Sequence, residues 1–225
     1  MRFTLIILTF FFVGQIQAQE FKFEAPNYKK IKKATSKKSS EFYYPNLLDR
    51  FESYDTSLNN DDYRHLYYGY LFQDGFEAYW SSPVDKQLNT YYRSQSINEE
   101  DYDTIISLIN VSLADFPFDL RNMNFKAFLY HKKGDDAMAN NIMRQYNAII
   151  DAMLSSGDGK TCESGIHVIS VSHEYLLLSI FELQMTQQSL IGDCDYMELA
   201  PGNHTVKGIY FNVSKILEAQ SSLFK

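Results

Sequence analysis

The chain has 225 residues, of which 45% are apolar and 22% charged. This composition supplies enough apolar side chains for a packed core and excludes an intrinsically disordered polypeptide. The formal net charge is −7, whereas non-specific binding of nucleic acid requires a net basic surface. We therefore expect a folded protein of one or two domains that does not bind nucleic acid.

Residues 1–18 have the pattern of a secretory signal peptide. Arg2 gives a positive start, the apolar run at residues 4–14 has the length of a signal core, and Ala18 is a small residue at the cleavage point. The run is too short to cross a bilayer as a helix, and no later stretch predicts a membrane span. We expect an exported protein, periplasmic or secreted, whose mature chain begins at Gln19.

Residues 19–40 are basic although the chain as a whole is acidic. The lysines of this segment are Lys29, Lys30, Lys32, Lys33, Lys37 and Lys38. Charge runs of this kind are typically solvated, so the pattern predicts a flexible basic arm. The alternative is an arm that contacts an anionic surface.

Helical patterning covers residues 41–156. Residues 59–62 supply the side chains that cap a helix. The helix that follows has a stripe at the spacing of a buried face, formed by Tyr63, Leu66, Tyr67, Tyr70 and Leu71. Gly69 is unfavourable inside a helix, so its presence predicts the close approach of a neighbouring helix.

Three further helices are expected between residues 97 and 155, starting near Asn98, Phe118 and Asp135. The short connections between them imply antiparallel neighbours. Asp101 and Asp135 are 34 residues apart, which is the period of tetratricopeptide repeats. The pattern predicts a tetratricopeptide-like stack of helical hairpins.

The chain changes character at residues 154–165, where glycine, serine and threonine replace apolar residues. After this joint, residues 166–171 and 209–213 have strand patterns, and residues 192–195 form the turn of a predicted hairpin. Residues 173–183 fit either a helix or a strand. We therefore predict an α+β fold in which a small, mainly antiparallel sheet, at residues 157–225, packs on the helical part.

Cys162 and Cys194 both lie in the predicted sheet part. Export to an oxidising compartment makes a disulfide between them possible. Two buried free thiols are an equal alternative on the sequence alone.

Few residues suggest catalysis. The segment at residues 157–161 lacks the first glycine of a phosphate-binding loop, and His173-Glu174 lacks the second histidine of a zinc-protease helix. We therefore predict no metal, no cofactor and no catalytic residue. The alternative is a hydrolase that uses acidic residues at the joint, Asp158 and Glu174.

Three tyrosines on one helix suggest a binding surface. Tyr67, Tyr68 and Tyr70 point in different directions, so they cannot all pack against the same neighbour. We expect Tyr68 to face outward, where a tyrosine makes a good contact residue. The resulting hypothesis is a non-catalytic interaction module for an unknown protein or peptide partner.

Short motifs in order along the chain resemble a known family. They are residues 66–70, residues 155–159, residues 168–169 with Glu174-Tyr175, and residues 210–212. Together they resemble domain of unknown function family 4919, a family of exported Bacteroidota proteins. The resemblance covers nearly the whole mature chain. It implies a bacterial envelope or secreted protein and supplies no catalytic residues to carry over.

Overall fold

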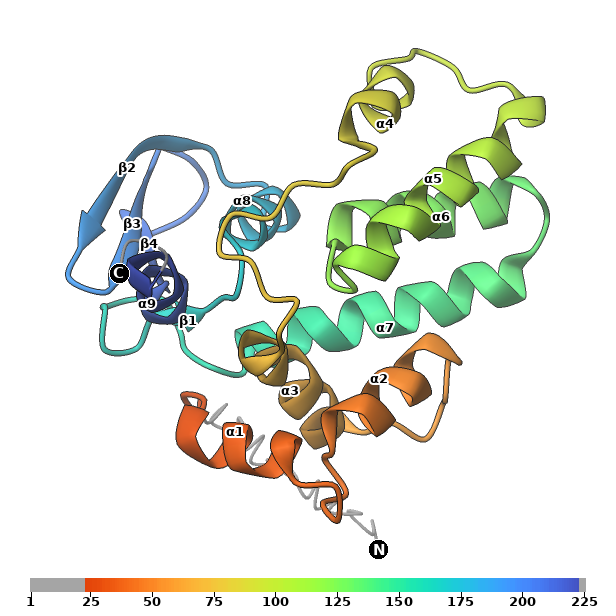
Figure 1. Ribbon diagram of the computed structural model, residues 1–225. Helices are drawn as coiled ribbons and strands as arrows, with labels where there is room; N and C mark the ends of the chain where they lie inside the picture. The colour runs from red at the N-terminus through yellow and green to blue at the C-terminus, as the bar shows by residue number, and fades with distance from the viewer. Residues whose placement is uncertain (1–22, 223–225) are drawn as a thin grey trace, which may run out of the picture.

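The computed structural model describes residues 23–222 and has an α+β fold (Figure 1). The helices in chain order are α1 Tyr28–Ser36, α2 Tyr44–Glu52, α3 Asn60–Gly69, α4 Asp85–Tyr92, α5 Tyr102–Asp115, α6 Leu120–Lys132, α7 Asp136–Leu154, α8 Val171–Ile180 and α9 Ser214–Ser222. The strands are β1 Ile166–His167, β2 Met185–Ile191, β3 Cys194–Leu199 and β4 Gly208–Asn212. The predicted fold class is confirmed. The predicted signal peptide at residues 1–18 lies outside the described residues.

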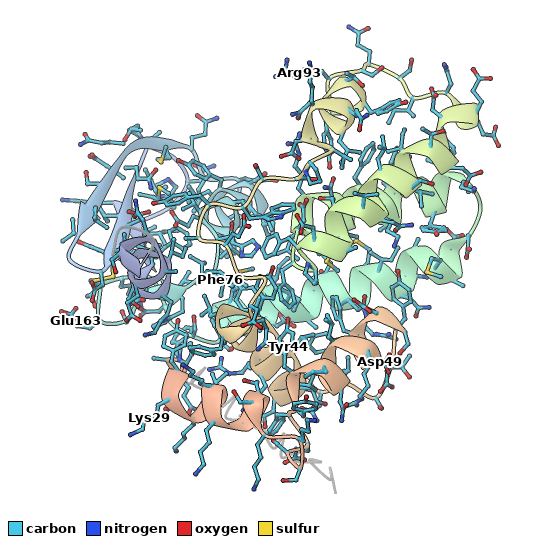
Figure 2. The ribbon with its side chains drawn as sticks, viewed as in Figure 1. Lys29, Tyr44, Asp49, Phe76, Arg93 and Glu163 are labelled. Carbon is cyan, nitrogen blue, oxygen red and sulfur yellow. A yellow bond between two sulfur atoms is a disulfide. The ribbon has the colours of Figure 1, made fainter. Side chains whose placement is uncertain are left out.

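Helix α1 forms where the sequence predicted a flexible arm, so that prediction was wrong for residues 28–36. Asn27 caps the helix by accepting a hydrogen bond from the Lys30 amide. Ile31 and Thr35 are buried against α3, while the lysines remain exposed; Lys29 points away from the body in Figure 2. The segment is therefore an amphipathic helix whose charged face is solvated.

Gly69 allows α1 and α3 to approach closely, as predicted. A Cβ atom at this position would lie 2.7 Å from Thr35 Cγ2 on α1 and 3.2 Å from the ring of Tyr44 on α2. Helix α3 itself begins with a reciprocal cap in which the side chains of Asn59 and Asp62 each accept a backbone N–H of the other.

Helices α5, α6 and α7 follow one another through short turns, and α6 lies alongside α7 (Figure 1). Asp101 and Asp135 occupy the N-cap positions of α5 and α7. The 34-residue spacing between them therefore joins equivalent positions of two helices. The hairpins are therefore present, but the tetratricopeptide-like relationship is not confirmed.

The sheet has the strand order β1-β4-β3-β2. Strand β1 is parallel to β4 and the other pairs are antiparallel. The predicted hairpin is β2–β3, and its turn contains Gly192 with a positive φ of 61°. Residues 171–180 form helix α8. Of the two alternatives for residues 173–183, helix or strand, the structure has the helix.

The joint between the helical part and the sheet is closely packed. A Cβ atom at Gly157 would lie 2.3 Å from the Gly165 carbonyl oxygen, and Gly159 has a positive φ of 66°. Gly159 also bonds to the sheet, since its carbonyl accepts the Tyr210 amide at 2.9 Å. A side chain at Gly157 would therefore force the backbone to move, and one at Gly159 would clash with the Ile209 side chain in a strained left-handed backbone.

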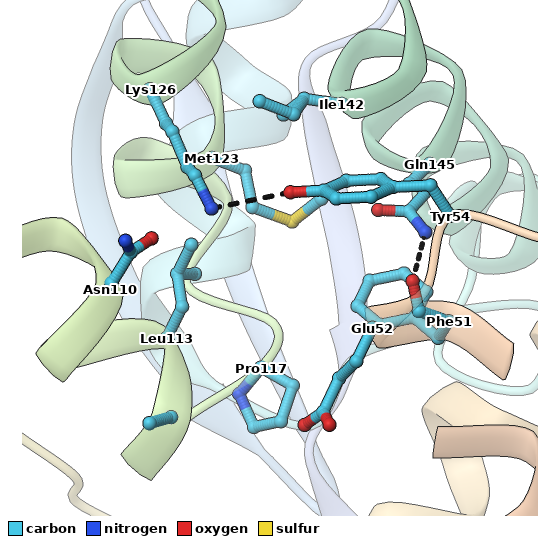
Figure 3. A pocket seen from close by; sticks show the side chains of 11 residues that line it. Phe51, Glu52, Tyr54, Asn110, Leu113, Pro117, Met123, Lys126, Ile142 and Gln145 are labelled. Atoms are coloured by element: carbon cyan, nitrogen blue, oxygen red, sulfur yellow. Dashed lines mark hydrogen bonds between the residues drawn. The ribbon is translucent and has the colours of Figure 1, made fainter. Parts of the chain in front are cut away.

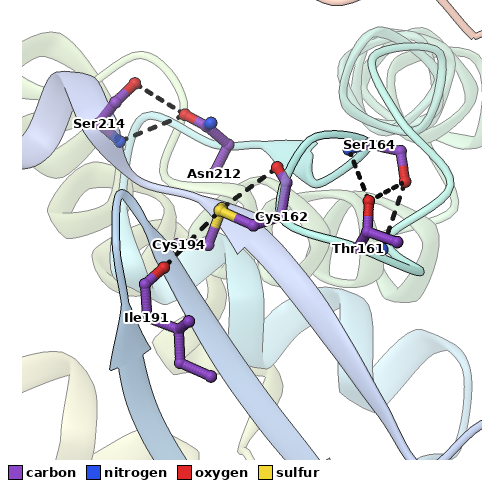
Figure 4. Close-up of a disulfide and its surroundings, with 7 residues drawn as sticks. All are labelled: Thr161, Cys162, Ser164, Ile191, Cys194, Asn212 and Ser214. Carbon is purple, nitrogen blue, oxygen red and sulfur yellow. Dashed lines mark hydrogen bonds between the residues drawn. A yellow bond between two sulfur atoms is a disulfide. The ribbon is translucent and has the colours of Figure 1, made fainter.

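A disulfide joins Cys162, in the joint, to Cys194, at the start of β3 (Figure 4). The bridge therefore ties the joint to the central antiparallel strands. Of the two alternatives that the sequence allowed, the structure has the disulfide.

Tyrosine hydroxyls connect the helical part to the sheet part. Tyr67 on α3 donates to His173 Nδ1 on α8 at 2.7 Å and accepts the Ile169 amide at 3.3 Å. Nε2 of His173 donates to the Phe118 carbonyl at 2.9 Å, because a carbonyl can only accept. Every member of this buried network, which we call the Tyr67–His173 network, thus has a partner.

The same helix makes a second set of contacts. The Tyr68 hydroxyl lies 3.2 Å from both the Ala152 and the His167 carbonyl oxygens. The Tyr28 hydroxyl oxygen on α1 lies 2.9 Å from His167 Nδ1. Helices α1, α3 and α7 and strand β1 are therefore linked through buried polar groups.

Candidate functional site

The three tyrosines proposed as a binding surface lie in the core. Tyr67 and Tyr68 are fully buried, and Tyr70 is 6% exposed. The expectation that Tyr68 faces outward was wrong. Helix α3 is covered by α1 on one side and α7 on another, and its tyrosines also reach the segment at residues 167–169. A helix enclosed on several sides buries residues that a single stripe would leave exposed.

Asp158 stabilises the turn of the joint. Its carboxylate accepts hydrogen bonds from the Ser164 hydroxyl at 2.6 Å and from the Lys160 amide at 3.1 Å. The Ser164 bond is the main reason why the pKa of Asp158 falls to about 2. All these partners belong to the joint itself, so Asp158 acts as a turn-forming carboxylate.

Glu174 is fully buried on α8, and neither carboxyl oxygen has a partner in normal hydrogen-bond geometry among residues 23–222. Burial, followed by repulsion from the nearby Asp195 carboxylate on β3, raises its pKa to about 9. Glu174 is therefore protonated at neutral pH. The structure gives Asp158 and Glu174 separate surroundings, one in a turn and one against β3.

A cavity of about 310 Å³ lies between α2, α5, α6 and α7 (Figure 3). Its apolar floor is formed by buried residues that include Phe51, Met123 and Ile142. Its polar groups are Glu52, Tyr54, Asn110, Lys126 and Gln145. An apolar interior with a few polar groups is the usual composition of a ligand site, so we take this cavity as the candidate functional site.

The Lys126 ammonium lies on the cavity wall and donates to the Tyr54 hydroxyl at 3.2 Å (Figure 3). Burial lowers the pKa of Lys126 and raises that of Tyr54, because desolvation disfavours the charged form of each. Within residues 23–222, no carboxylate lies at ion-pair distance from Lys126. The cavity thus contains a desolvated positive charge bonded to a neutral hydroxyl.

Tyr54 has an uncommon backbone conformation, with φ at 58°. The left-handed conformation of a non-glycine residue destabilises the folded state by about 1–2 kcal/mol. Two hydrogen bonds hold it there: its amide donates to the Phe51 carbonyl at 3.0 Å, and its carbonyl accepts Arg144 Nη2 at 2.9 Å. This conformation places the aromatic ring beside Lys126 in the cavity wall.

Comparison with known proteins identifies the family of the chain. A family model described as domain of unknown function, DUF4919, matches residues 29–222. The chain belongs to the DUF4919 family. The resemblance that we drew from short motifs is therefore confirmed for nearly the whole chain. No curated protein and no solved structure matches it.

A second cavity in this DUF4919 chain, of about 190 Å³, includes Asp119, Arg121 and His173 in its lining. Asp119 caps α6, since its carboxylate accepts from the Asn122 amide and the Ser112 hydroxyl. His173 belongs to the Tyr67–His173 network. Because Asp119 and His173 already have structural partners, the cavity with Lys126 is the stronger candidate.

In the described part of the chain, no helix combines the length and apolar composition needed to cross a bilayer. Likewise, residues 23–222 contain no group of three or more His, Cys, Asp or Glu side chains placed to hold a metal ion.

Sequence reasoning did not identify Tyr54 or Lys126. Tyr54 follows α2 at a position with no glycine to signal a left-handed residue. Lys126 has one available signal, because it stands between two buried positions on α6, Met123 and Ala127. A lysine at the edge of an apolar stripe is more often a solvated residue whose stem covers apolar surface, so the signal is weak.

The raised pKa of Glu174 predicts a pH-dependent stability. In the unfolded chain this carboxyl ionises near pH 4.5, and in the folded chain near pH 9, so the folded state binds more protons between these values. The free energy of unfolding should therefore fall with rising pH across this window, by up to about 1.4 kcal/mol per pH unit. Glu174→Gln should remove this term.

Urea unfolding between pH 6 and 9 tests this expectation. The stability of Glu174→Gln relative to the unsubstituted protein should increase steadily with pH. Glu198→Gln, at an exposed position on β3, provides the control and should show no such trend. Parallel pH profiles for Glu174→Gln and the unsubstituted protein would contradict the assignment of a protonated Glu174.

Proposed function

We propose that this DUF4919 protein is an exported, non-catalytic binding module. Its cavity between α2, α5, α6 and α7 holds a segment of a protein or peptide partner. The observation that carries the proposal is the composition of the cavity: a buried apolar floor beside a desolvated ammonium and several uncharged polar groups.

The shape of the site supports a macromolecular segment as the ligand. The cavity is bordered by helices on several sides, and its polar rim includes the exposed side chains of Glu52 and Asn110. Grooves between helices are a recurrent binding surface for peptides that insert apolar side chains. Polar groups at the rim then pair with the peptide backbone.

The alternative, a hydrolase that uses acids at the joint, has no geometric support. Catalysis by a carboxylate pair requires both groups to face the same substrate. Asp158 is bonded within its own turn, whereas Glu174 is fully buried against β3. We therefore prefer the binding module.

Export is supported by the signal-peptide pattern of residues 1–18. The disulfide between Cys162 and Cys194 is a second supporting feature, because disulfides persist in oxidising compartments such as the periplasm and the extracellular space. Together they favour a periplasmic or secreted protein.

Filling the cavity should abolish partner binding. Ala114 lines the cavity at an exposed position on α5, so Ala114→Phe should block it with little effect on stability. The protein would be panned against a random peptide library, and enriched peptides measured by calorimetry. Ala114→Phe should weaken their binding at least about tenfold.

Val111→Phe is the matched control for this experiment. Val111 lies on the same helix and is 48% exposed, and it is not among the residues that line the cavity. This variant should bind enriched peptides normally. Failure to enrich any peptide, or equal binding by the Ala114→Phe variant, would overturn the cavity as the binding site.

Export has a separate test. Mass spectrometry of the protein from its native host should show a mature chain that begins at or near Gln19. An intact N-terminus in a cytoplasmic fraction would contradict the proposed location.

A further inference from the structure

The hydrogen bond between Lys126 and Tyr54 leaves the phenolic hydrogen of Tyr54 and the other ammonium hydrogens of Lys126 unused. An ammonium can only donate, so the Tyr54 oxygen is the acceptor in this 3.2 Å contact. The phenolic hydrogen of Tyr54 is then available to a second acceptor. No acceptor for it occurs among the hydrogen bonds of the described residues. Lys126 and Tyr54 therefore present two adjacent donors in the cavity.

The charges around the cavity favour an anion at this end. Lys126 is desolvated and has no carboxylate partner within the described part of the chain. Arg144 adds a second positive charge beside Tyr54, whose carbonyl it holds at 2.9 Å. The one carboxylate in the lining, Glu52, lies at the far end of the view from Lys126 (Figure 3). The cavity is thus positive at one end and negative at the other.

We propose that the cavity binds the C-terminal carboxylate of a partner peptide whose last residue is apolar. The carboxylate accepts hydrogen bonds from Lys126 and Tyr54, and the last side chain packs on Phe51, Met123 and Ile142. This inference rests on the proposed function and names the part of the partner that the cavity recognises.

A charged ligand explains why the cavity keeps a half-buried ammonium. Partial removal of an ammonium from water destabilises the empty protein unless a counter-charge reaches it. A carboxylate that enters the cavity supplies that counter-charge and forms charge-assisted hydrogen bonds, which are the stronger kind. The left-handed conformation of Tyr54 fits the same account, because backbone strain concentrates at binding sites.

The rim favours a peptide over a simple acyl carboxylate. Glu52 is exposed at the end opposite Lys126 and can accept a backbone N–H, and Asn110 can both donate and accept. An acyl chain has no N–H group that could donate to either residue. A peptide that continues out of the cavity can pair with both.

Defined probes test the inference directly. The protein would carry 13C-methyl methionine, which places an NMR reporter on the cavity floor at Met123. The probes are the dipeptide N-acetyl-Leu-Phe as the free acid, the same dipeptide as the C-terminal amide, and octanoate. The free acid should shift the Met123 resonance at concentrations at least about tenfold below those of the other two probes.

Substitutions on α6 assign the effect to the ammonium. Lys126→Met should reduce the affinity for the acid to that for the amide, and it should raise the melting temperature because a desolvated charge is removed. Lys126→Arg should retain the preference for the acid. Lys132→Met is the control, since Lys132 is exposed on the same helix, and it should change neither property.

The inference fails if the acid and the amide bind equally, if the acid leaves the Met123 resonance unchanged, or if octanoate binds as tightly as the dipeptide acid. Equal binding of acid and amide at the cavity would leave the proposed peptide-binding function intact. The proposed function fails separately, through the cavity-filling variant Ala114→Phe and its library-derived peptides.

Discussion

The buried hydrogen bond between Tyr67 and His173 holds the two parts of this protein in one arrangement. It joins α3, in the helical part, to α8, which lies between strands β1 and β2 in the chain. Burial lowers the pKa of His173 to about 4, so the ring stays neutral and can accept at Nδ1 while it donates at Nε2. A network in which every buried group has a partner specifies one packing arrangement, because other arrangements would leave some groups unpaired.

This constraint also determines where a binding site can lie. Because the tyrosines of α3 are used to connect neighbouring segments, they are not available at the surface. The region between α2, α5, α6 and α7 is packed differently. There Tyr54 and Lys126 contact each other in the wall of an open cavity instead of filling the core. The same residue type, tyrosine, therefore serves structure in one place and a candidate site in another.

Much of the fold follows from local sequence signals. The cap formed by Asn59 and Asp62, the turn of the β2–β3 hairpin and the close approach at Gly69 each depend on residues near one another in the sequence or on a single small residue. Patterns of this kind act over a few positions, so they can be interpreted without knowledge of the tertiary structure.

The features that the sequence analysis mispredicted or did not identify have a different origin. Helix α1 was interpreted as a mobile arm because its lysines obscured a short buried stripe that contains Ile31 and Thr35. The exposure expected for Tyr68 assumed that α3 has one neighbour, whereas α1 and α7 both cover it. The pairing of Lys126 with Tyr54 joins residues 72 positions apart. Such contacts depend on how helices pack, which a single sequence does not reveal.

The most direct test of this account compares the free energy of unfolding of the Tyr67→Phe variant with that of the Tyr44→Phe variant. Removing the Tyr67 hydroxyl leaves the Ile169 amide and His173 Nδ1 without partners, which should lower the free energy of unfolding by about 2 kcal/mol or more. The Tyr44 hydroxyl is buried and has no hydrogen-bond partner in the described part of the chain, so its removal should be neutral or stabilising. Equal unfolding free energies for the two variants in urea would contradict the central role of the Tyr67–His173 network.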